Sequence, residues 1–308
     1  MQKSGYIGRF APSPTGKLHM GSLLAAVASW CDAKHQGGTW LVRMEDLDPP
    51  REVEGASDDI LRTLEGHGLH WDGDVVYQSH RSDLYKDALE GLKQGGRVFP
   101  CACSRKDLAG KAVYPGTCRR GLPHHKEARL SRFQMGEGTL AWEDLILGQT
   151  SFEGRDLGDF PVLRADGLWA YQLAVVVDDR DQGVTHVIRG SDLLDSTPRQ
   201  IQLWSALAKL TSTDLIDSLP EYGHLPVLEN KLGQKLSKQT LAQPVQVSQA
   251  MTSVMRVLQW LNQPVGDEGI QGASQSGDVH QLLLRAAEKW DRSLVPTQAI
   301  QWQGEGQG

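Results

Sequence analysis

The chain has 308 residues, 39% of them hydrophobic, and a net charge of −6, which is an ordinary composition for a soluble globular protein. This length can bury a sizeable core and predicts two or three lobes. The negative balance excludes a global electrostatic attraction to nucleic acid or anionic membranes, so any contact with nucleic acid needs a local basic patch.

The sequence also bounds the cellular compartment. The apolar run at residues 23–31 is too short to span a bilayer and lacks a basic leader, so we expect no membrane anchor and no secretory signal. Three of the four cysteines lie between residues 101 and 118, which favours a metal site in a reducing compartment over disulfides. We therefore expect a cytoplasmic protein.

In chain order, short apolar or β-branched runs alternate with helical stretches. We expect strands at residues 5–11, 39–44, 173–177 and 184–188. We expect helices at residues 22–35, 82–94 and 198–209. The alternation predicts a Rossmann-type α/β fold, in which helices cover both faces of a doubly wound parallel sheet. The near-continuous apolar character of LAVVV, residues 173–177, predicts a strand buried on both faces.

Two segments depart from this alternation. Residues 99–167 are rich in Cys, Arg, Lys and Gly, and they divide the core into residues 1–98 and 168–215, so we interpret them as an insertion. Residues 216–308 have a mainly helical and looped pattern. Within that last region GDEGIQGASQSG predicts a flexible loop, and the final QGEGQG predicts disorder.

Ionisable residues follow the predicted strands. They are Arg9, Glu45, Asp46, Asp178, Asp179, Arg189 and Asp192. In a parallel sheet the carboxyl ends of the strands meet at one edge, and ligands bind beyond it. Charges are ordinary where a single strand reaches the surface. Four strand ends that carry both signs of charge favour a site for a polar ligand.

Residues 12–22, PSPTGKLHMGS, lie at that edge between the first predicted strand and the first helix. Gly16 and Gly21 have the spacing of a phosphate-binding P-loop, but Ser22 stands where the lysine of that motif belongs. A tight loop before a helix N-terminus still offers backbone N–H groups and a helix dipole to an anion, and His19 adds a donor. Alternatively, His19 caps the helix and the prolines shape a turn, and this stretch alone leaves both interpretations open.

A second stretch, KLGQKLSKQ at residues 231–239, places Lys235 and Lys238 on either side of a serine. Alone, such a loop is usually a solvated surface. Paired with PSPTGKLHMGS, it resembles the two signatures of class I aminoacyl-tRNA synthetases, with HMGS at the position of HIGH and KLSKQ at that of KMSKS. Ser22 replaces the last histidine of HIGH, as is common in glutamyl enzymes, and Gln239 replaces the last serine of KMSKS.

The resemblance is to the glutamate-specific branch in particular. It rests on RFAPSPTGKLHMGS, and it continues through RMEDLD, YQLAVVVDD and THVIRGSDLLDSTPRQ, so that it covers about residues 5–240. It implies that a glutamate α-carboxylate attacks the α-phosphorus of ATP, with Mg²⁺ bound to the nucleotide. The implied catalytic residues are His19, Lys235 and Lys238. The implied ATP-binding residues are Pro12, Gly16, His19, Gly21, Ser22 and Lys238.

The resemblance also implies a glutamate pocket. Arg9 is assigned to a carboxylate and Glu45 to the α-amino group, with Tyr171 and Arg189 beside them. The remaining implied pocket residues are Phe10, Ala11, Pro12 and Ser13. Two arginines and one glutamate balance the two carboxylates and one ammonium of the substrate, and arginine can hold a carboxylate through two hydrogen bonds. Which arginine holds which carboxylate stays open, and Tyr171 has the alternative of a core aromatic.

The insertion carries a candidate metal site. The spacing of Cys101, Cys103 and Cys118 suits Zn²⁺, and the residues alone suggest His124 or His125 as the fourth ligand. The resemblance to glutamyl-type enzymes implies Tyr114 instead. The alternative is that the three cysteines are simply reduced and buried.

The same insertion supplies a basic patch. Residues 105–132 contain eight Lys or Arg residues and two acidic ones, Asp107 and Glu127. A solvated face is the usual explanation of such a run. Beside an adenylation site, this basic lobe indicates a contact with an RNA backbone.

Only 69 residues follow Gln239, too few for an anticodon-binding domain of about 100 residues or more. A catalytic core with a zinc lobe and a stem-contact-like helical region resembles the truncated glutamyl-type synthetases that place glutamate on queuosine in tRNA(Asp), at the wobble position, without needing tRNA for activation. This resemblance implies ATP, L-glutamate and queuosine-containing tRNA(Asp) as partners of a monomer. The alternatives are a minimal glutamyl-tRNA synthetase that charges a 3′ end and a non-catalytic RNA-binding paralogue.

Overall fold

The computed structural model describes residues 5–210, 218–230, 233, 243–264 and 278–302. At its centre three parallel strands lie in the order β1 (Ile7–Phe10), β2 (Thr39–Met44) and β3 (Val76–Tyr77). A second parallel pair consists of β9 (His186–Gly190) and β10 (Glu221–Leu225).

The two groups of strands meet where β9 runs beside β1. The amide of Thr185, just before β9, donates to the carbonyl oxygen of Ile7 at 2.9 Å. The amide of Ile7 donates back to the Thr185 hydroxyl at 2.8 Å. The parallel strands therefore lie in the order β10, β9, β1, β2, β3, and the predicted α/β fold with a parallel sheet is confirmed.

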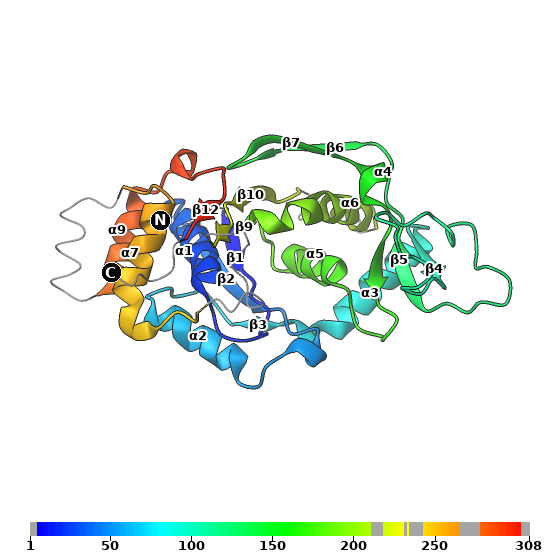
Figure 1. The fold of residues 1–308 in the computed structure, drawn as a ribbon, viewed down its shortest axis with the longest axis horizontal. Helices are drawn as coiled ribbons and strands as arrows, with labels where there is room; N and C mark the ends of the chain where they lie inside the picture. The colour runs from blue at the N-terminus through cyan, green and yellow to red at the C-terminus, as the bar shows by residue number, and fades with distance from the viewer. Residues whose placement is uncertain (1–4, 211–217, 231–232, 234–242, 265–277, 303–308) are drawn as a thin grey trace.

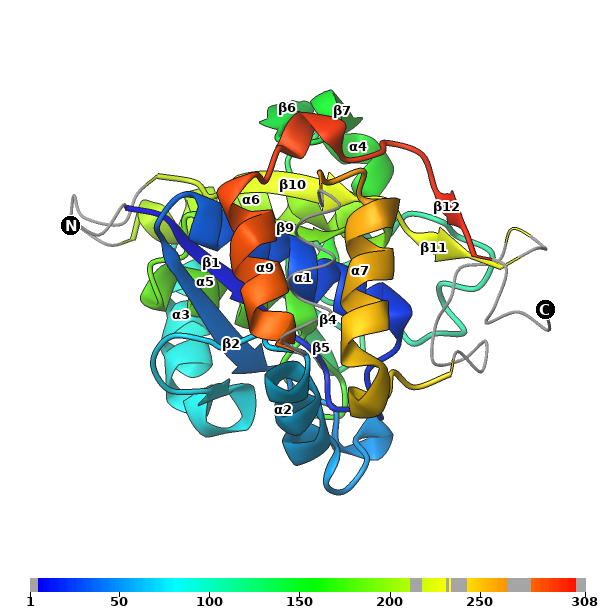
Figure 2. The same cartoon turned by 90° about the vertical axis from the view of Figure 1, so that its left-hand side faces the viewer.

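Helices cover the two sides of this sheet (Figure 1). On one side α1 (Met20–His35) packs against α7 (Ala250–Trp260) and α9 (Val279–Glu288), and Figure 2 shows this group from its outer face. On the other side lie α3 (Ser82–Gln94), α5 (Tyr171–Asp181) and α6 (Thr197–Ala208). Each group has its own cluster of buried hydrophobic residues, so the molecule has two main cores. The predicted helices at residues 22–35, 82–94 and 198–209 correspond to α1, α3 and α6.

The prediction for LAVVV was wrong. Residues 173–177 belong to the helix α5, and the strand that completes the parallel sheet is β10. A run without alternation fits a strand buried on both faces or a helix buried all round, and periodicity does not separate the two. Here residues 173–179 are all buried, because α3, α6 and β8 pack against α5 and Asp179 pairs with Arg9 of β1, so this part of the helix has no solvent-exposed face.

Most of the predicted insertion lies at the right of Figure 1, and its strands share a cluster of buried hydrophobic residues with α3, α5 and α6. Its small antiparallel sheet has the order β4 (Val98–Cys101), β5 (Leu130–Phe133), β8 (Phe160–Leu163). A hairpin of β6 (Thr139–Asp144) and β7 (Gly148–Glu153), followed by the short helix α4 (Gly154–Leu157), runs back over α6 toward β10. At its tip the Leu145 amide donates to the Tyr222 carbonyl oxygen at 2.8 Å, so the insertion contacts the central sheet.

The remaining elements are short. α2 (Ala56–Gly66) follows β2, and β11 (Leu228–Glu229) pairs with β12 (Ile300–Gln301). Single 3₁₀ turns occur at Pro49–Arg51, Gln78–Arg81, Ser191–Ser196, Val247–Gln249 and Arg292–Leu294. Among the described residues, no helix is both long and apolar enough to cross a bilayer. The predicted loop at residues 266–277 and the final QGEGQG lie outside the described residues.

Candidate functional site

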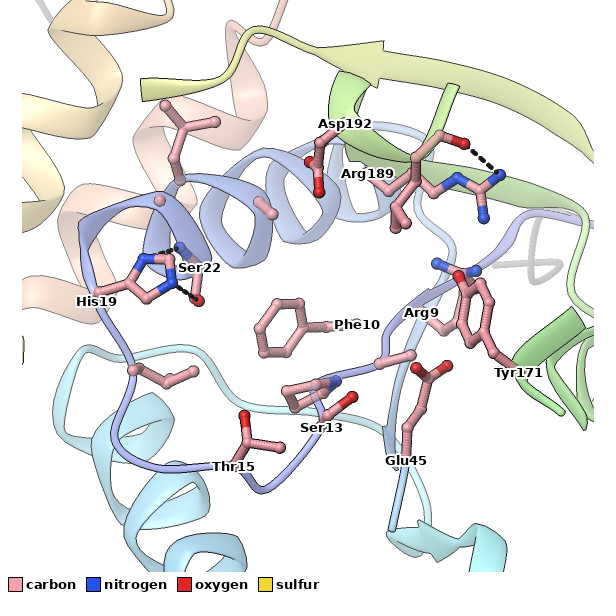
Figure 3. A pocket seen from close by; sticks show the side chains of 18 of the residues that line it. Arg9, Phe10, Ser13, Thr15, His19, Ser22, Glu45, Tyr171, Arg189 and Asp192 are labelled. Atoms are coloured by element: carbon pink, nitrogen blue, oxygen red, sulfur yellow. Dashed lines mark hydrogen bonds between the residues drawn. The ribbon is translucent and has the colours of Figure 1, made fainter. Parts of the chain in front are cut away.

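A cavity of about 500 Å³ opens at the carboxyl ends of β1, β2 and β9, beside the N-terminus of α1 (Figure 3). All eight residues predicted to bind glutamate line it: Arg9, Phe10, Ala11, Pro12, Ser13, Glu45, Tyr171 and Arg189. His19, Gly21 and Ser22 of the predicted nucleotide site line it as well. Lys235 and Lys238 lie outside the described residues. The structure therefore brings together most of the side chains that the sequence motifs singled out.

The loop between β1 and α1 is fixed by backbone hydrogen bonds. The amide of Glu45 donates to the Pro12 carbonyl oxygen at 3.0 Å, and the amide of Val53 donates to that of Pro14 at 3.0 Å. Gly16 has a φ of 132°, a conformation that residues with a side chain rarely adopt. Gly16 does not line the cavity, so its contribution is to the course of the loop.

His19 combines both interpretations that the sequence allowed. It is the N-cap of α1, where its Nδ1 accepts the Ser22 amide at 3.2 Å and its Nε2 lies 3.3 Å from the Ser22 hydroxyl. The same imidazole lines the cavity. The N-terminus of a 16-residue helix brings a positive dipole end to this position, which suits an anion such as a phosphate group.

The other end of the cavity gathers charged and phenolic groups. In Figure 3, Arg9, Glu45, Tyr171 and Arg189 lie together on the far side of Phe10 from His19. The cavity thus has a cationic and carboxylate-bearing end, called here the amino-acid end. The end formed by His19, Ser22 and the start of α1 is called the nucleotide end.

Arg9 is held by a buried ion pair. Its Nε and Nη2 atoms lie 3.2 and 3.3 Å from the two carboxylate oxygens of Asp179 on α5. Asp179 also lies 2.8 Å from Nη2 of Arg43 on β2. Burial acts to raise the pKa of Asp179, but the charges and hydrogen bonds of Arg9 and Arg43 outweigh it and lower that pKa, so the carboxylate is ionised. Asp179 is therefore a partner of the pocket arginine and not, as predicted, a strand end.

Glu45 is the acidic group of the amino-acid end. Burial raises its pKa to about 7, against the opposing charges of Arg43 and Arg9. The nearest arginine nitrogen, Nη2 of Arg43, is 3.9 Å from Oε1 of Glu45. A carboxylate that is desolvated in this way is suited to pair with a ligand cation.

Arg189 enters the cavity from β9, and its side chain is 5% exposed. Its Nη2 atom donates to the Thr197 hydroxyl at 2.7 Å, and its Nε atom lies 3.4 Å from Nε2 of His224. Among the described residues, its Nη1 atom has no hydrogen-bond partner. A buried guanidinium with one unsatisfied nitrogen is suited to bind an anionic ligand.

Four residues that support the side chains of the cavity were not predicted from the sequence, namely Arg43, Asp144, Thr197 and His224. Arg43 stands within the apolar strand TWLVRM, and a charge in a buried strand needs a partner, so its position carried a signal. Thr197 stands within the motif THVIRGSDLLDSTPRQ, but nothing in that motif indicates its hydrogen bond to Arg189. Asp144 and His224 are distant in sequence from the motifs, and the packing of β6 against β10 brings them to this position.

The three cysteines of the insertion form a cluster that can hold a metal ion, with their sulfur atoms within 4.8 Å of one another. The Tyr114 hydroxyl oxygen lies 3.4 Å from Sγ of Cys101 and 3.9 Å from Sγ of Cys103. His124 and His125 are exposed, their rings pack against each other, and neither belongs to the cluster. Of the three residues suggested as a fourth ligand, only Tyr114 lies beside the cysteine cluster.

The surroundings of Cys101 favour its thiolate form, whereas burial raises the pKa of Cys103. Burial acts to raise the pKa of Cys101, but hydrogen bonds from Tyr114, the Cys103 backbone and Arg132 outweigh it and lower that pKa. The guanidinium of Arg132 also lies 4.2 Å from the centre of the Tyr114 ring. Thiolate is the form of cysteine that binds metals.

The structure separates the predicted basic patch into residues that are paired or buried and residues that are exposed. Arg119 pairs through two nitrogens with buried Asp159, at 2.6 and 2.8 Å, Lys126 lies 3.5 Å from Asp107, and Arg132 is buried. The exposed basic residues that remain are Arg105, Lys106, Lys111, Arg120 and Arg129.

Comparisons with known proteins agree with this geometry. The family described as tRNA synthetases class I (E and Q), catalytic domain, matches residues 7–114 and 117–263. A relative from Chromobacterium violaceum is 49% identical over 309 residues, which cover 98% of this chain and 99% of the relative. One from Dechloromonas aromatica is 50% identical over 307 residues, which cover 96% and 98%. Both are named glutamyl-Q tRNA(Asp) synthetase.

A solved structure shows the same fold. The crystal structure of a glutamate-tRNA synthetase from Elizabethkingia anophelis superposes with a TM-score of 0.79 at 22% identity, over 97% of this chain and 68% of that one. The chain belongs to the class I family of glutamyl- and glutaminyl-tRNA synthetase catalytic domains, and within it to the glutamyl-Q tRNA(Asp) synthetases.

Proposed function

We propose that the chain activates L-glutamate with ATP, without needing tRNA, and transfers the glutamate to queuosine at the wobble position of tRNA(Asp). The observation that carries this proposal is the division of one cavity into two ends, with two arginines and a glutamate at one and a helix N-terminus with His19 at the other. The names of relatives that are about half identical over nearly their whole length support the same function.

In the first step a glutamate α-carboxylate oxygen attacks the α-phosphorus of ATP. A bond forms between that oxygen and phosphorus, and the bond to the β,γ-diphosphate breaks, giving glutamyl-adenylate and pyrophosphate. In the second step a hydroxyl of queuosine attacks the glutamyl carbonyl carbon, and AMP leaves. Both steps depend mainly on positioning and on stabilising developing charge.

The amino-acid end supplies the recognition of glutamate. Arg9 and Arg189 hold the two carboxylates, Glu45 pairs with the α-ammonium, and Tyr171 closes the wall between them. Phe10, Ala11, Pro12 and Ser13 form the floor of the cavity. A substrate without the carboxylate that Arg189 holds would leave the buried Nη1 atom of Arg189 without a partner among the described residues, so the pocket prefers a substrate with two carboxylates.

The nucleotide end supplies the binding of ATP, with Pro12, His19, Gly21 and Ser22 around the phosphates and Gly16 shaping the loop that carries them. We assign Lys235 and Lys238, which lie outside the described residues, to the departing pyrophosphate. Mg²⁺ bound with the nucleotide would neutralise part of the phosphate charge.

In the insertion we propose one structural Zn²⁺ held by Cys101, Cys103, Cys118 and Tyr114. The ion would fix the lobe that carries the exposed basic residues, which we assign to the RNA backbone. We further propose that residues 1–98 and 168–215 form the catalytic unit, residues 99–167 the zinc lobe and residues 216–308 a helical region, in a cytoplasmic monomer.

The test of function uses labelled glutamate, ATP and tRNA(Asp), with and without queuosine, followed by mapping of the labelled nucleotide. Label is expected on queuosine, charging should survive removal of the terminal adenosine, and tRNA(Asp) with guanine at the wobble position should stay unlabelled. Glutamylation of tRNA(Glu) at its 3′ end, with queuosine-containing tRNA(Asp) inert, would instead establish a minimal glutamyl-tRNA synthetase. RNA binding without any glutamate-dependent pyrophosphate exchange would establish the non-catalytic alternative.

The test of the metal is elemental analysis of protein purified without chelator, which should contain about one zinc per chain. Cys103→Ser should lower the zinc content and destabilise the insertion, because the binding of structural zinc is coupled to folding. Tyr114→Phe should weaken zinc affinity. Unchanged affinity in that variant would exclude Tyr114 as the fourth ligand.

A further inference from the structure

Arg189 is held by a chain of buried side chains that starts outside the cavity. Its Nη2 donates to the Thr197 hydroxyl at 2.7 Å, and the Thr197 oxygen lies 2.9 Å from Nε2 of His224. On the other side of its ring, Nδ1 of His224 lies 2.5 Å from Oδ2 of Asp144. Thr197 and His224 are 0% exposed and Asp144 is 2% exposed, so no link of the chain competes with water.

The chemistry of the groups fixes the direction of each hydrogen bond. Oδ1 of Asp144 accepts the amides of Ile146, Leu147 and His224 at 3.0–3.1 Å, an arrangement that suits an ionised carboxylate. Burial lowers the pKa of His224, so its ring is neutral and carries one N–H. Because a carboxylate only accepts, that N–H is on Nδ1, and Nε2 is left as an acceptor.

This tautomer determines what Thr197 and Arg189 do. The Thr197 hydroxyl donates to Nε2 of His224, and its oxygen is then oriented to accept from Nη2 of Arg189. Nε of Arg189 also points to Nε2 of His224, at 3.4 Å, and its Nη2 lies 3.5 Å from the Leu193 carbonyl oxygen. Of the guanidinium nitrogens of Arg189, only Nη1 has no partner among the described residues. The hydrogen bonds from Asp144 to Arg189 therefore determine which part of the guanidinium is left for a ligand.

We infer that Asp144, His224 and Thr197 are positioning residues that hold Arg189 in the orientation in which it binds a carboxylate of the amino-acid substrate. The inference rests on the proposed function, since it takes glutamate as the ligand of the cavity. Asp144 stands on the β6–β7 hairpin, so the insertion that carries the cysteine cluster also orients a side chain of the amino-acid end. None of the three residues lines the cavity, and each acts through Arg189.

The test compares Thr197→Val, which keeps the shape and removes the hydroxyl, with Thr197→Ser, which keeps the hydroxyl. Glutamate-dependent pyrophosphate exchange gives the KM for glutamate and the KM for ATP separately. Thr197→Val should raise the KM for glutamate about tenfold or more, as expected for loss of a hydrogen bond to a charged group, and change the KM for ATP by less than about twofold. Thr197→Ser should restore the KM for glutamate to within about threefold. Thr63→Val, which removes another buried hydroxyl at a residue that does not line the cavity, is the matched control.

A second variant tests whether the hydrogen-bonded residues from Asp144 to Arg189 act as a unit. Asp144→Asn can turn an amide N–H toward Nδ1 of His224, which moves the ring proton to Nε2 and removes the acceptor for Thr197. It should raise the KM for glutamate by a similar factor. In the double variant with Thr197→Val, the KM for glutamate should be little higher than in either single variant, because the effects of substitutions within one hydrogen-bond network are not additive.

The inference is overturned by an unchanged KM for glutamate in Thr197→Val, by equal rises for glutamate and ATP, or by fully additive effects in the double variant. Calorimetric titration with glutamate separates this failure from that of the proposed function. A wild-type protein that neither binds glutamate nor catalyses exchange contradicts the proposed function itself. Binding by the wild type that is equally strong in Thr197→Val contradicts only the positioning role.

Discussion

The two ends of the cavity are built differently. At the amino-acid end, Arg9 and Arg189 are both held by buried partners from other elements, Arg9 by Asp179 of α5 and Arg189 by Thr197 of α6 and His224 of β10. At the nucleotide end, the described groups are the loop backbone, which accepts the amides of Glu45 and Val53, and His19, whose Nδ1 accepts the Ser22 amide of its own helix. One end is thus held by buried ion pairs and side-chain hydrogen bonds, the other by backbone hydrogen bonds and a helix cap.

The difference follows from what each end must do. A buried charge is tolerated only when it is paired, so a pocket for a small doubly charged amino acid needs counter-charges that are already in place before the ligand arrives. Phosphates are bound by backbone N–H groups and a helix dipole, which the start of α1 provides without any buried ion pair. Changes at the amino-acid end should therefore affect folding and binding together, whereas changes at the nucleotide end should act mainly on the rate.

The largest expected effect is on stability. Asp179→Ala removes the shared partner of Arg9 and Arg43 and leaves two buried guanidinium groups without it. Breaking a buried pair in this way costs about 3–5 kcal/mol in the free energy of unfolding, which denaturant titration measures.

The matched control is Asp181→Ala on the same helix. Asp181 pairs with Arg81, but its side chain is 50% exposed against 6% for Asp179, so its loss should cost less than about 1 kcal/mol. Equal losses of stability in the two variants would show that the amino-acid end is not held by this buried pair.

A change at the nucleotide end should act on catalysis with little effect on the affinity for glutamate. His19→Ala, or Lys238→Ala, should lower the rate of pyrophosphate exchange by about 10²–10³, as for one preorganised charge-stabilising donor. The dissociation constant for glutamate, measured without ATP, should change by less than about twofold.

His19→Asn separates the two roles of this residue, because asparagine is a good N-cap but lacks the imidazole. It should keep the stability of the wild type and still lose exchange. Full-rate exchange in both the His19→Ala and the Lys238→Ala variants would overturn the catalytic assignment.

The two ends also differ in how well the sequence predicts them. The nucleotide end is contiguous in sequence, because residues 12–22 form one loop and the start of one helix. Its turn residues and its helix cap could therefore be predicted from the local sequence. The amino-acid end is assembled from β1, β2, α5 and β9, and motif resemblance supplied its lining residues. Its supports Arg43, Thr197, His224 and Asp144 depend on tertiary packing, which no local pattern encodes.

The error at LAVVV has the same origin. Neighbouring residues indicate how apolar a segment is, but whether it lies in a sheet or between helices depends on distant partners. Asp178 and Asp179 were recognised as important because they follow that run. In the structure Asp178 pairs with Arg81 and Asp179 with Arg9, and both pairs depend on the position of the helix α5.

A smaller effect concerns pH at the amino-acid end. Glu45 must lose its proton to pair with the ligand ammonium, and burial raises its pKa to about 7. Below that value the pocket carboxyl is increasingly neutral, so affinity for glutamate should fall as pH falls, by about tenfold between pH 8 and pH 6. Calorimetric titration across this range measures the effect.

Glu45→Gln is the control, since glutamine does not titrate. This variant should bind glutamate weakly at both pH values, and its affinity should vary little between them. A wild-type affinity that stays constant from pH 6 to pH 8 would show that this carboxyl is fully ionised throughout.

The smallest expected effect concerns two neighbouring arginines of the insertion. They test whether, outside the cavity too, a charge held by a buried partner stabilises the fold while an exposed charge serves binding. Arg120 is exposed, whereas its neighbour Arg119 pairs with buried Asp159 and with Glu137. If Arg120 contacts an RNA phosphate, Arg120→Ala should weaken tRNA binding a few-fold and reduce the slope of log K against log salt by about 1, with exchange unchanged. Arg119→Ala should instead destabilise the insertion, because it leaves the Asp159 carboxylate buried without its charge partner. An unchanged salt slope in Arg120→Ala would place the RNA on another face, and the same titration with Lys111→Ala or Arg129→Ala would then locate it.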